Sequence, residues 1–200
     1  MARDSADVQA DEALSRLLDG NRRFVAGNLK QLMGPALVRR RYALAREQTP
    51  FAVIVGCSDS RVPPELIFDV TLGEIFVIRT AGEVVDSVAL GSIEYAIEHL
   101  GTRLIVVLGH QRCGAVSAAV SGATEGGDIS IVLNAILPAV EATKDHAGDP
   151  IDNAVRADAR EIARRLQITG AIIPPRVQSG EVKVVAAYYS LDSGQVELLN

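Results

Sequence analysis

Three short runs of apolar, mostly β-branched residues constrain the fold of this 200-residue chain more than any other feature. They cover residues 51–56, 75–78 and 104–108, and segments with helix signals separate them. Short apolar strands that alternate with helices are typical of a mostly parallel sheet with helices packed against it. The sequence therefore predicts an α/β fold with a mostly parallel central β-sheet flanked by helices.

Start and stop signals place the other elements. Prolines and capping residues predict helices over 63–68 and 86–100, one from about Cys113 and one from Asp149. Two apolar runs joined by turn residues, 182–189 and 196–199, predict a C-terminal hairpin. Residues 10–25 repeat apolar side chains at helical spacing, with Gly20-Asn21 as a candidate point for a bend or break.

The chain length and the absence of a visible linker or internal repeat predict a single domain over residues 1–200. We expect a helical arm over about residues 1–45 and an α/β core over about residues 46–200. The arm precedes the first strand, so it is placed either to pack on the sheet or to reach a partner subunit.

Composition excludes several functional classes. The formal net charge of −5 argues against nucleic acid as a partner, and Arg39-Arg40-Arg41 is interpreted as a solvated helix face. No run reaches the roughly 18 apolar residues of a membrane span, because polar residues interrupt the longest candidate, Ile129–Val140. Met1–Asp7 has no apolar leader region, and two cysteines make no disulfide framework, so a reducing, cytoplasmic setting is expected.

The only two cysteines follow two of the predicted strands. Cys57 comes directly after residues 51–56, and His110 and Cys113 come shortly after residues 104–108. Since the carboxyl ends of parallel strands meet at one edge of a sheet, we expect these side chains to lie together. Two thiolates and one imidazole suit zinc with one coordination position open. The alternative is that the cysteines are small buried hydrophobes and the histidine is merely hydrogen-bonded.

Asp59 and Arg61 lie two and four residues after Cys57. An aspartate–arginine pair forms directional, bidentate hydrogen bonds, and near a turn it is often only a structural salt bridge. The functional interpretation is that Asp59 accepts a proton from zinc-bound water while Arg61 holds the carboxylate away from the metal. In acid, Asp59 itself would become the fourth zinc ligand and close the site.

The sequence Cys-Ser-Asp-Ser-Arg at 57–61, followed by Gly-His-Gln-Arg-Cys-Gly at 109–114, resembles the β-class carbonic anhydrases. Further matching segments extend the resemblance from about Leu14 to the last strand: Gly20-Asn21, Arg23-Phe24, Gln48 with Pro50, 64–69, 73–79, Ala81-Gly82 and 92–96. Residues 121–150 match least. The paired motifs at this separation are highly specific.

The resemblance implies a reversible hydration of carbon dioxide to bicarbonate and a proton by attack of zinc-bound hydroxide. It implies one Zn²⁺ per chain held by Cys57, His110 and Cys113, with Asp59 and Arg61 as the catalytic dyad. It also implies a homodimer or larger homo-oligomer in which partner subunits share the substrate pocket. Its matching pocket positions are Gln48, Phe76 and Tyr95, and we add Val62 as an apolar wall for carbon dioxide. The bicarbonate-regulated subset uses a tryptophan that this chain lacks.

Three other functions stay open at this point. The zinc site could belong to a non-catalytic regulatory protein, although such a site needs no Asp59–Arg61 pair. Cys57 and Cys113 could form a thiol redox sensor. A related zinc hydrolase acting on carbon disulfide or carbonyl sulfide would use the same chemistry and differ only in access to the pocket.

Overall fold

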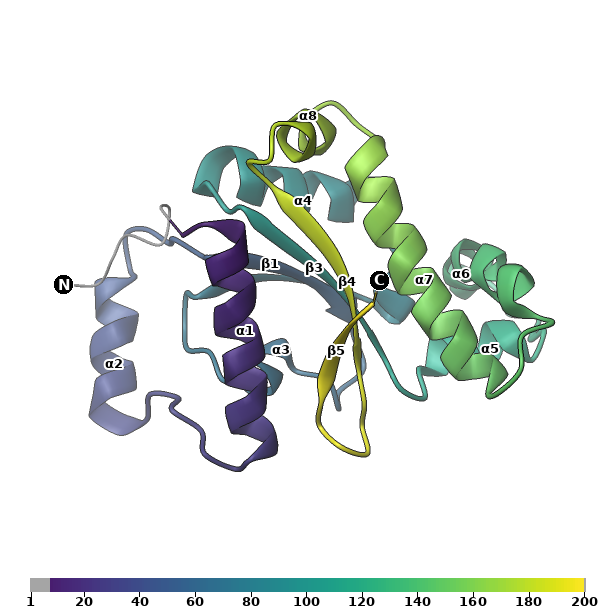
Figure 1. Ribbon diagram of the computed structural model, residues 1–200, viewed down its shortest axis with the longest axis horizontal. Coiled ribbons are helices and arrows are strands. Elements are labelled where there is room, and N and C mark those ends of the chain that lie inside the picture. The colour runs from purple at the N-terminus through teal and green to yellow at the C-terminus, as the bar shows by residue number, and fades with distance from the viewer. Residues whose placement is uncertain (1–7, 200) are drawn as a thin grey trace.

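The computed structural model describes residues 8–199; Met1–Asp7, on which the expectation about a leader rested, and Asn200 lie outside the described part. Its centre is a five-stranded sheet of order β2-β1-β3-β4-β5 (Figure 1). The strands are β1 Ala52–Cys57, β2 Ile75–Thr80, β3 Leu104–His110, β4 Lys183–Tyr189 and β5 Val196–Leu199. The first four are parallel to one another, and β5 is antiparallel to β4. The predicted α/β class and the C-terminal hairpin are thus confirmed.

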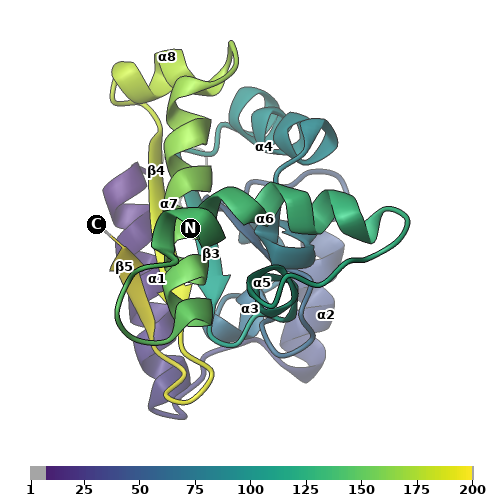
Figure 2. The same ribbon diagram turned by 90° about the vertical axis from the view of Figure 1, so that its right-hand side faces the viewer.

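Helices lie on both sides of this sheet (Figures 1 and 2). They are α1 Ala10–Val25, α2 Gly34–Ala43, α3 Pro64–Ile67, α4 Ser87–Leu100, α5 Gly114–Val120, α6 Ile129–Thr143, α7 Pro150–Ile168 and α8 Ile173–Gln178, with a 3₁₀ turn, η2, at Ala81–Glu83. The predicted caps are present: the Asp86 carboxylate accepts a hydrogen bond from the Ala89 N–H, and Asp149 accepts one from the Ile151 N–H. Within residues 8–199, no helix has both the length and the apolarity needed to cross a membrane.

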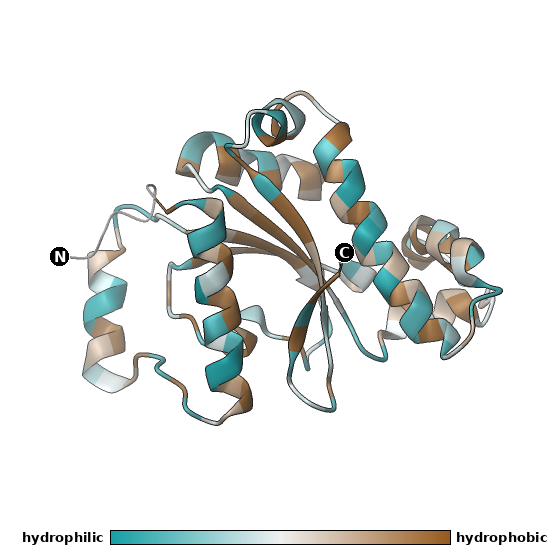
Figure 3. Ribbon diagram, in the orientation of Figure 1, coloured by the Kyte–Doolittle hydropathy of each residue, from teal (hydrophilic) through white to brown (hydrophobic). Residues whose placement is uncertain are grey.

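Two apolar clusters hold the sheet between helices. Alternate strand residues such as Ile54 and Val106 belong to one cluster with α1 and α3, which continues beneath α5 and α6. Their sequence neighbours Val53 and Ile105 belong to the other, with α4, α7 and α8. Because both faces are covered, the strands are almost continuously hydrophobic (Figure 3), as expected for a parallel sheet.

The first helix runs through Gly20-Asn21 without interruption, so this pair is not a helix break. A Cβ atom on Gly20 would lie 1.7 Å from the Phe68 carbonyl oxygen, so the glycine allows α1 to approach α3 closely. The buried Asn21 side chain donates to the carbonyls of Ile67 and Gly194 and accepts from the Val196 N–H. The pair therefore fastens α1 to α3 and to the hairpin.

The second helix behaves differently from the rest. None of the ten residues of α2 is buried, and the helix lies at the side of the molecule away from α5 and α6 (Figure 1). Arg39 and Arg41 are exposed on it, as the interpretation of a solvated face predicted. Arg40 donates to the Leu72 carbonyl, which ties α2 to the loop before β2.

Candidate metal centre

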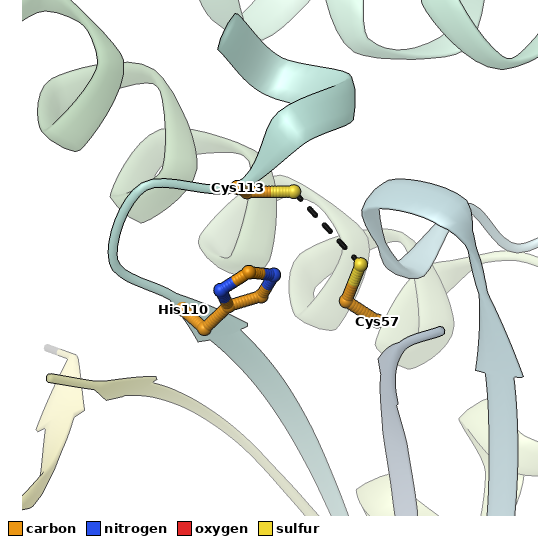
Figure 4. A group of neighbouring side chains, drawn as sticks. All are labelled: Cys57, His110 and Cys113. Carbon is orange, nitrogen blue, oxygen red and sulfur yellow. Dashed lines mark hydrogen bonds between the residues drawn. The ribbon is translucent and has the colours of Figure 1, made fainter. Parts of the chain in front are cut away.

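The two cysteines and the histidine meet at the carboxyl edge of the sheet. Cys57 ends β1, His110 ends β3 and Cys113 precedes the first turn of α5. Their side chains point toward one another (Figure 4), their ligand atoms all lie within 4.8 Å of one another, and all three residues are buried. The structure therefore brings together the three residues that the sequence predicted as ligands.

The spacing of the sulfur atoms matches a metal site. The two Sγ atoms are 3.9 Å apart. Two sulfurs bound tetrahedrally at the usual Zn–S distance would be separated by about 3.8 Å. A disulfide would require a separation of about 2.05 Å.

The histidine ring is oriented to offer one nitrogen to a metal. Its Nδ1 lies 3.0 Å from the Gln111 carbonyl oxygen and donates to it. Its Nε2 is buried and has no hydrogen-bond partner. A hydrogen bond that fixes the proton on one ring nitrogen leaves the lone pair of the other free, as is usual for metal-binding histidines. An unpartnered buried nitrogen beside two thiols thus fits zinc.

The local electrostatics favours a thiolate at Cys57. The pKa of Cys57 is lowered well below its usual value, chiefly by the hydrogen bond from the Cys113 thiol, while the pKa of Cys113 is raised by the same hydrogen bond and by burial. The Gly82 N–H, 3.4 Å from the Cys57 sulfur, also donates to it. Thiolate is the form that binds metal, so the site is prepared for a cation.

Beside the ligands, Asp59 and Arg61 form the predicted pair. The Arg61 side chain donates to Asp59 through Nε at 2.9 Å and Nη2 at 2.6 Å, and the Arg61 backbone N–H donates at 2.9 Å. These bonds hold the pKa of Asp59 well below its usual range. Asp59 Oδ2 lies 4.0 Å from His110 Nε2, so the carboxylate borders the site while remaining bound to Arg61.

Two further residues with ionisable side chains, Arg79 and Glu83, lie beside the site. Arg79 donates from Nε to the Cys57 carbonyl at 2.8 Å and from Nη2 to the Asp59 carbonyl at 2.5 Å, and so ties β2 to the ligand loop. Glu83 is fully buried with positive φ, and neither of its carboxylate oxygens has a partner. Burial raises the pKa of Glu83 well above its usual value, and the neighbouring Asp158 adds to the shift. Nothing in the sequence marked Glu83 as buried, since glutamates are rarely enclosed.

The expected pocket residues do not all reach this centre. Val62 is buried close to it, and its N–H donates to the Asp59 carbonyl. Gln48 is exposed and borders a groove that includes Ile75, at the amino end of the sheet. Phe76 pairs with Val53, four positions before Cys57, which is about 13 Å along the strand.

The fourth expected pocket residue, Tyr95, is 49% exposed on α4, where its ring packs beside that of His99 with centroids 4.9 Å apart. Within one chain, therefore, only Val62 of the expected pocket residues adjoins the ligands.

Comparison with known proteins gives the same answer as the geometry. The sequence profile of the carbonic anhydrase family matches residues 52–196. The chain is 41% identical over 190 residues to carbonic anhydrase 2 of Mycobacterium tuberculosis, with 93% of this chain and 91% of that protein covered. It is 40% identical to the carbonic anhydrase of Mycolicibacterium smegmatis, with the same coverage.

Solved structures of β-carbonic anhydrases share this fold. The β-carbonic anhydrase CcaA superimposes with a TM-score of 0.73 and 26% identity, covering 94% of this chain and 95% of that one. A tetrameric β-carbonic anhydrase from Sordaria macrospora gives a TM-score of 0.71 and 25% identity, covering 80% and 85%. The chain belongs to the carbonic anhydrase family, and within it to the zinc-dependent β class that the sequence motifs indicated.

Proposed function

We propose that this protein catalyses the reversible hydration of carbon dioxide to bicarbonate and a proton at the centre formed by Cys57, His110 and Cys113. The observation that carries this proposal is the buried ligand triad, with its unpartnered imidazole nitrogen, directly beside the Asp59–Arg61 pair. When bound, zinc acidifies a water molecule and thereby supplies the nucleophile. The protein residues must hold the metal, orient the water and admit an apolar substrate.

Asp59 is the group that we propose orients the attacking water and accepts its hydrogen bond. Its Oδ2 lies 4.0 Å from His110 Nε2, close enough to reach a molecule bound next to that nitrogen. The bidentate hydrogen bonds from Arg61 keep the carboxylate from moving onto the metal. The Arg61 bonds to Asp59 support an open site, and the proposed closed site, with Asp59 as fourth ligand, would require both Arg61 side-chain bonds to break.

The rest of the substrate pocket is proposed to come from a partner subunit. Gln48, Phe76 and Tyr95 lie away from the ligands of their own chain, and α2 has no buried residue. Large apolar side chains are exposed along the arm, among them Met33 at 76% and Tyr42 at 70%. In this proposal α2 and the exposed residues next to it pack on a second copy, and the tetrameric relative from Sordaria macrospora supports an assembly of this kind.

The alternatives are weaker on the same geometry. A regulatory zinc site has no need of the triply hydrogen-bonded Asp59–Arg61 pair. Redox-sensor cysteines are usually solvent-accessible, whereas Cys57 and Cys113 are both buried. Two free, buried thiols also suit the reducing environment of the cytoplasm, which is the proposed location.

The experiment that tests the proposal compares wild-type protein with the Asp59→Asn variant at equal zinc content. We expect chelator-sensitive carbon dioxide hydration by the wild type in a stopped-flow assay. Asn keeps the shape of Asp59 but loses its charge, so activity should fall by about 100-fold or more while zinc stays bound. Glu161→Gln, which breaks a surface pair with Arg164, serves as a control that should leave the rate unchanged.

Full activity of Asp59→Asn would remove Asp59 from the mechanism. An inactive wild type with one zinc per chain would contradict the proposed reaction. Turnover of carbonyl sulfide or carbon disulfide by that same sample would then assign it to the related hydrolases.

A further inference from the structure

We propose that Asp192, in the loop between β4 and β5, is a positioning residue for the metal centre. It holds Gln111 and Arg112, the two residues between the ligands His110 and Cys113, in the conformation that orients both His110 and Arg61. The inference rests on the proposed function, and it adds to that function a residue 79 positions away from the nearest ligand in sequence.

The segment between the two ligands is conformationally strained. Arg112 has φ of +54°, in the left-handed region that non-glycine residues seldom occupy. Such a conformation persists only where surrounding contacts enforce it. The ligand spacing of two residues depends on this turn, because it carries the chain from the end of β3 into α5.

The hairpin loop supplies those contacts. Asp192 accepts from Arg112 through both oxygens, Nη1 to Oδ2 at 3.0 Å and Nη2 to Oδ1 at 2.6 Å. It also accepts from Gln111 Nε2 at 2.8 Å. In return, the Gln111 side-chain oxygen accepts from the Asp192 N–H at 3.1 Å and from the Ser190 hydroxyl at 3.2 Å. One carboxylate therefore fixes both side chains of the strained segment.

The backbone carbonyls of this same segment face the metal centre. The Gln111 carbonyl accepts from His110 Nδ1 at 3.0 Å and thereby sets the orientation of the ring and its free Nε2. The Arg112 carbonyl accepts from Arg61 Nη2 at 3.2 Å, while the same nitrogen donates to Asp59. By fixing this segment, Asp192 positions the His110 ring through the Gln111 carbonyl. It also positions Arg61, and with it Asp59, through the Arg112 carbonyl.

A merely structural role would predict something different. The Asp192 side chain is 63% exposed and outside the apolar clusters, and exposed ion pairs contribute little to stability. Its removal should therefore act on the geometry of the site much more than on folding. The Glu161–Arg164 pair is a matched control, because it is also bidentate, at 2.7 and 2.8 Å, and exposed, but it lies within α7.

The test compares Asp192→Ala with Glu161→Ala in the full-length, metal-loaded protein. Zinc affinity is measured by competition with a chelator, and the visible spectrum is recorded after cobalt replaces zinc. Partners that orient metal ligands typically change metal affinity by 10- to 100-fold, and we expect about a tenfold loss for Asp192→Ala. We also expect a shifted cobalt spectrum and a fall in kcat at nearly unchanged KM, with thermal stability equal to that of Glu161→Ala.

Two more variants protect the test against a folding artefact. Asp192→Asn retains an acceptor oxygen and should give intermediate zinc affinity. In the variant that combines Arg112→Ala with Asp192→Ala the two losses should be less than additive, because both remove the Arg112–Asp192 link while only Asp192→Ala also removes the bond to Gln111. If Asp192→Ala matches Glu161→Ala in zinc affinity, cobalt spectrum and kcat, the inference is wrong. The affinity and spectrum test it even if the wild type proves inactive toward carbon dioxide, so the two proposals can fail separately.

Discussion

Carboxyl groups around the metal centre illustrate how strongly the surroundings of a residue decide its chemistry. Arg61 holds the pKa of Asp59 well below its usual range, whereas burial raises the pKa of Glu83 well above it. Burial also raises the pKa of Asp158, on α7, to about 7. The same functional group is thus anionic where it faces the ligands and favoured in its neutral form behind them.

Asp158 gives a prediction about the pH dependence of stability. Burial raises its folded-state pKa from 3.8 to about 7; Glu161 adds to the shift, Arg165 opposes it, and Glu83 is the carboxyl nearby on η2. The stability that protonated Asp158 contributes is full below about pH 4 and is lost as the pH rises to about 7. Asp158→Asn should therefore stabilise the protein at pH 8 by roughly 1–3 kcal/mol, but hardly at pH 4.

Thermal unfolding of Asp158→Asn and wild type at pH 4, 6 and 8 measures this difference. Asp145→Asn, at an exposed position, is the control for the general effect of removing a negative charge. A stability difference that stays constant across the three pH values would show that Asp158 is not titrating in the folded protein.

The site residues that could be identified from the sequence are those that lie in short motifs close to one another along the chain. Cys57, His110 and Cys113 follow strand ends within short motifs, and Asp59 lies two residues from a ligand, so spacing alone placed them. Arg79 and Asp192 act through contacts with residues 20 to 80 positions away, and Glu83 is enclosed by the fold without a hydrogen-bond partner. No local pattern records such contacts, and they were found only in the fold.

Among the elements, α1 shows where a correct helix prediction can misjudge one residue. The 3.6-residue period over 10–25 predicted the helix, but Gly20 looked like a break because glycine disfavours helices. Its real function is steric, since the Phe68 carbonyl lies where a side chain would be. Packing of this kind depends on α3, which is 44 residues further along the chain.

Two helical glycines, one packed against another helix and one facing open space, should respond in opposite ways to alanine. Gly20→Ala should destabilise the protein by about 2–4 kcal/mol, because α1 must move off α3 to admit the Cβ. Gly91→Ala, in α4, has no atom within 4 Å of the new Cβ and should stabilise by about 0.5–1 kcal/mol. Chemical denaturation gives the change in the free energy of unfolding for each variant. The same change in both variants would contradict the packing explanation.

At the level of the whole molecule, the exposed arm and the scattered pocket residues suggest that a second copy of the chain completes the substrate pocket. The sequence predicted the α/β fold, the hairpin and the ligand triad, because these follow from strand patterning and motif spacing. Gln48 precedes β1 by four residues, which places it at the amino end of the sheet, away from the ligands of its own chain. Whether a second copy completes the site is therefore a question for mixed assemblies.

Complementation between two inactive variants answers that question. Gln48→Ala and Asp59→Asn are co-expressed with different tags and compared with each variant alone. If Gln48 serves the site of its partner, random mixed dimers contain one intact site, and about a quarter of wild-type activity should return. If Gln48 serves its own chain, both sites of the mixed dimer remain defective and no activity returns.

A zinc titration of the metal-free protein, followed by carbon dioxide hydration in a stopped-flow instrument, shows whether the ligand triad is a catalytic zinc site. The three converging ligands predict that activity rises linearly and stops rising at one zinc per chain. Cys113→Ser removes one of the three ligands, so its activity should no longer rise to a plateau at one zinc per chain. Activity that is independent of zinc, or saturation of the Cys57–His110–Cys113 site without any hydration, would contradict the account.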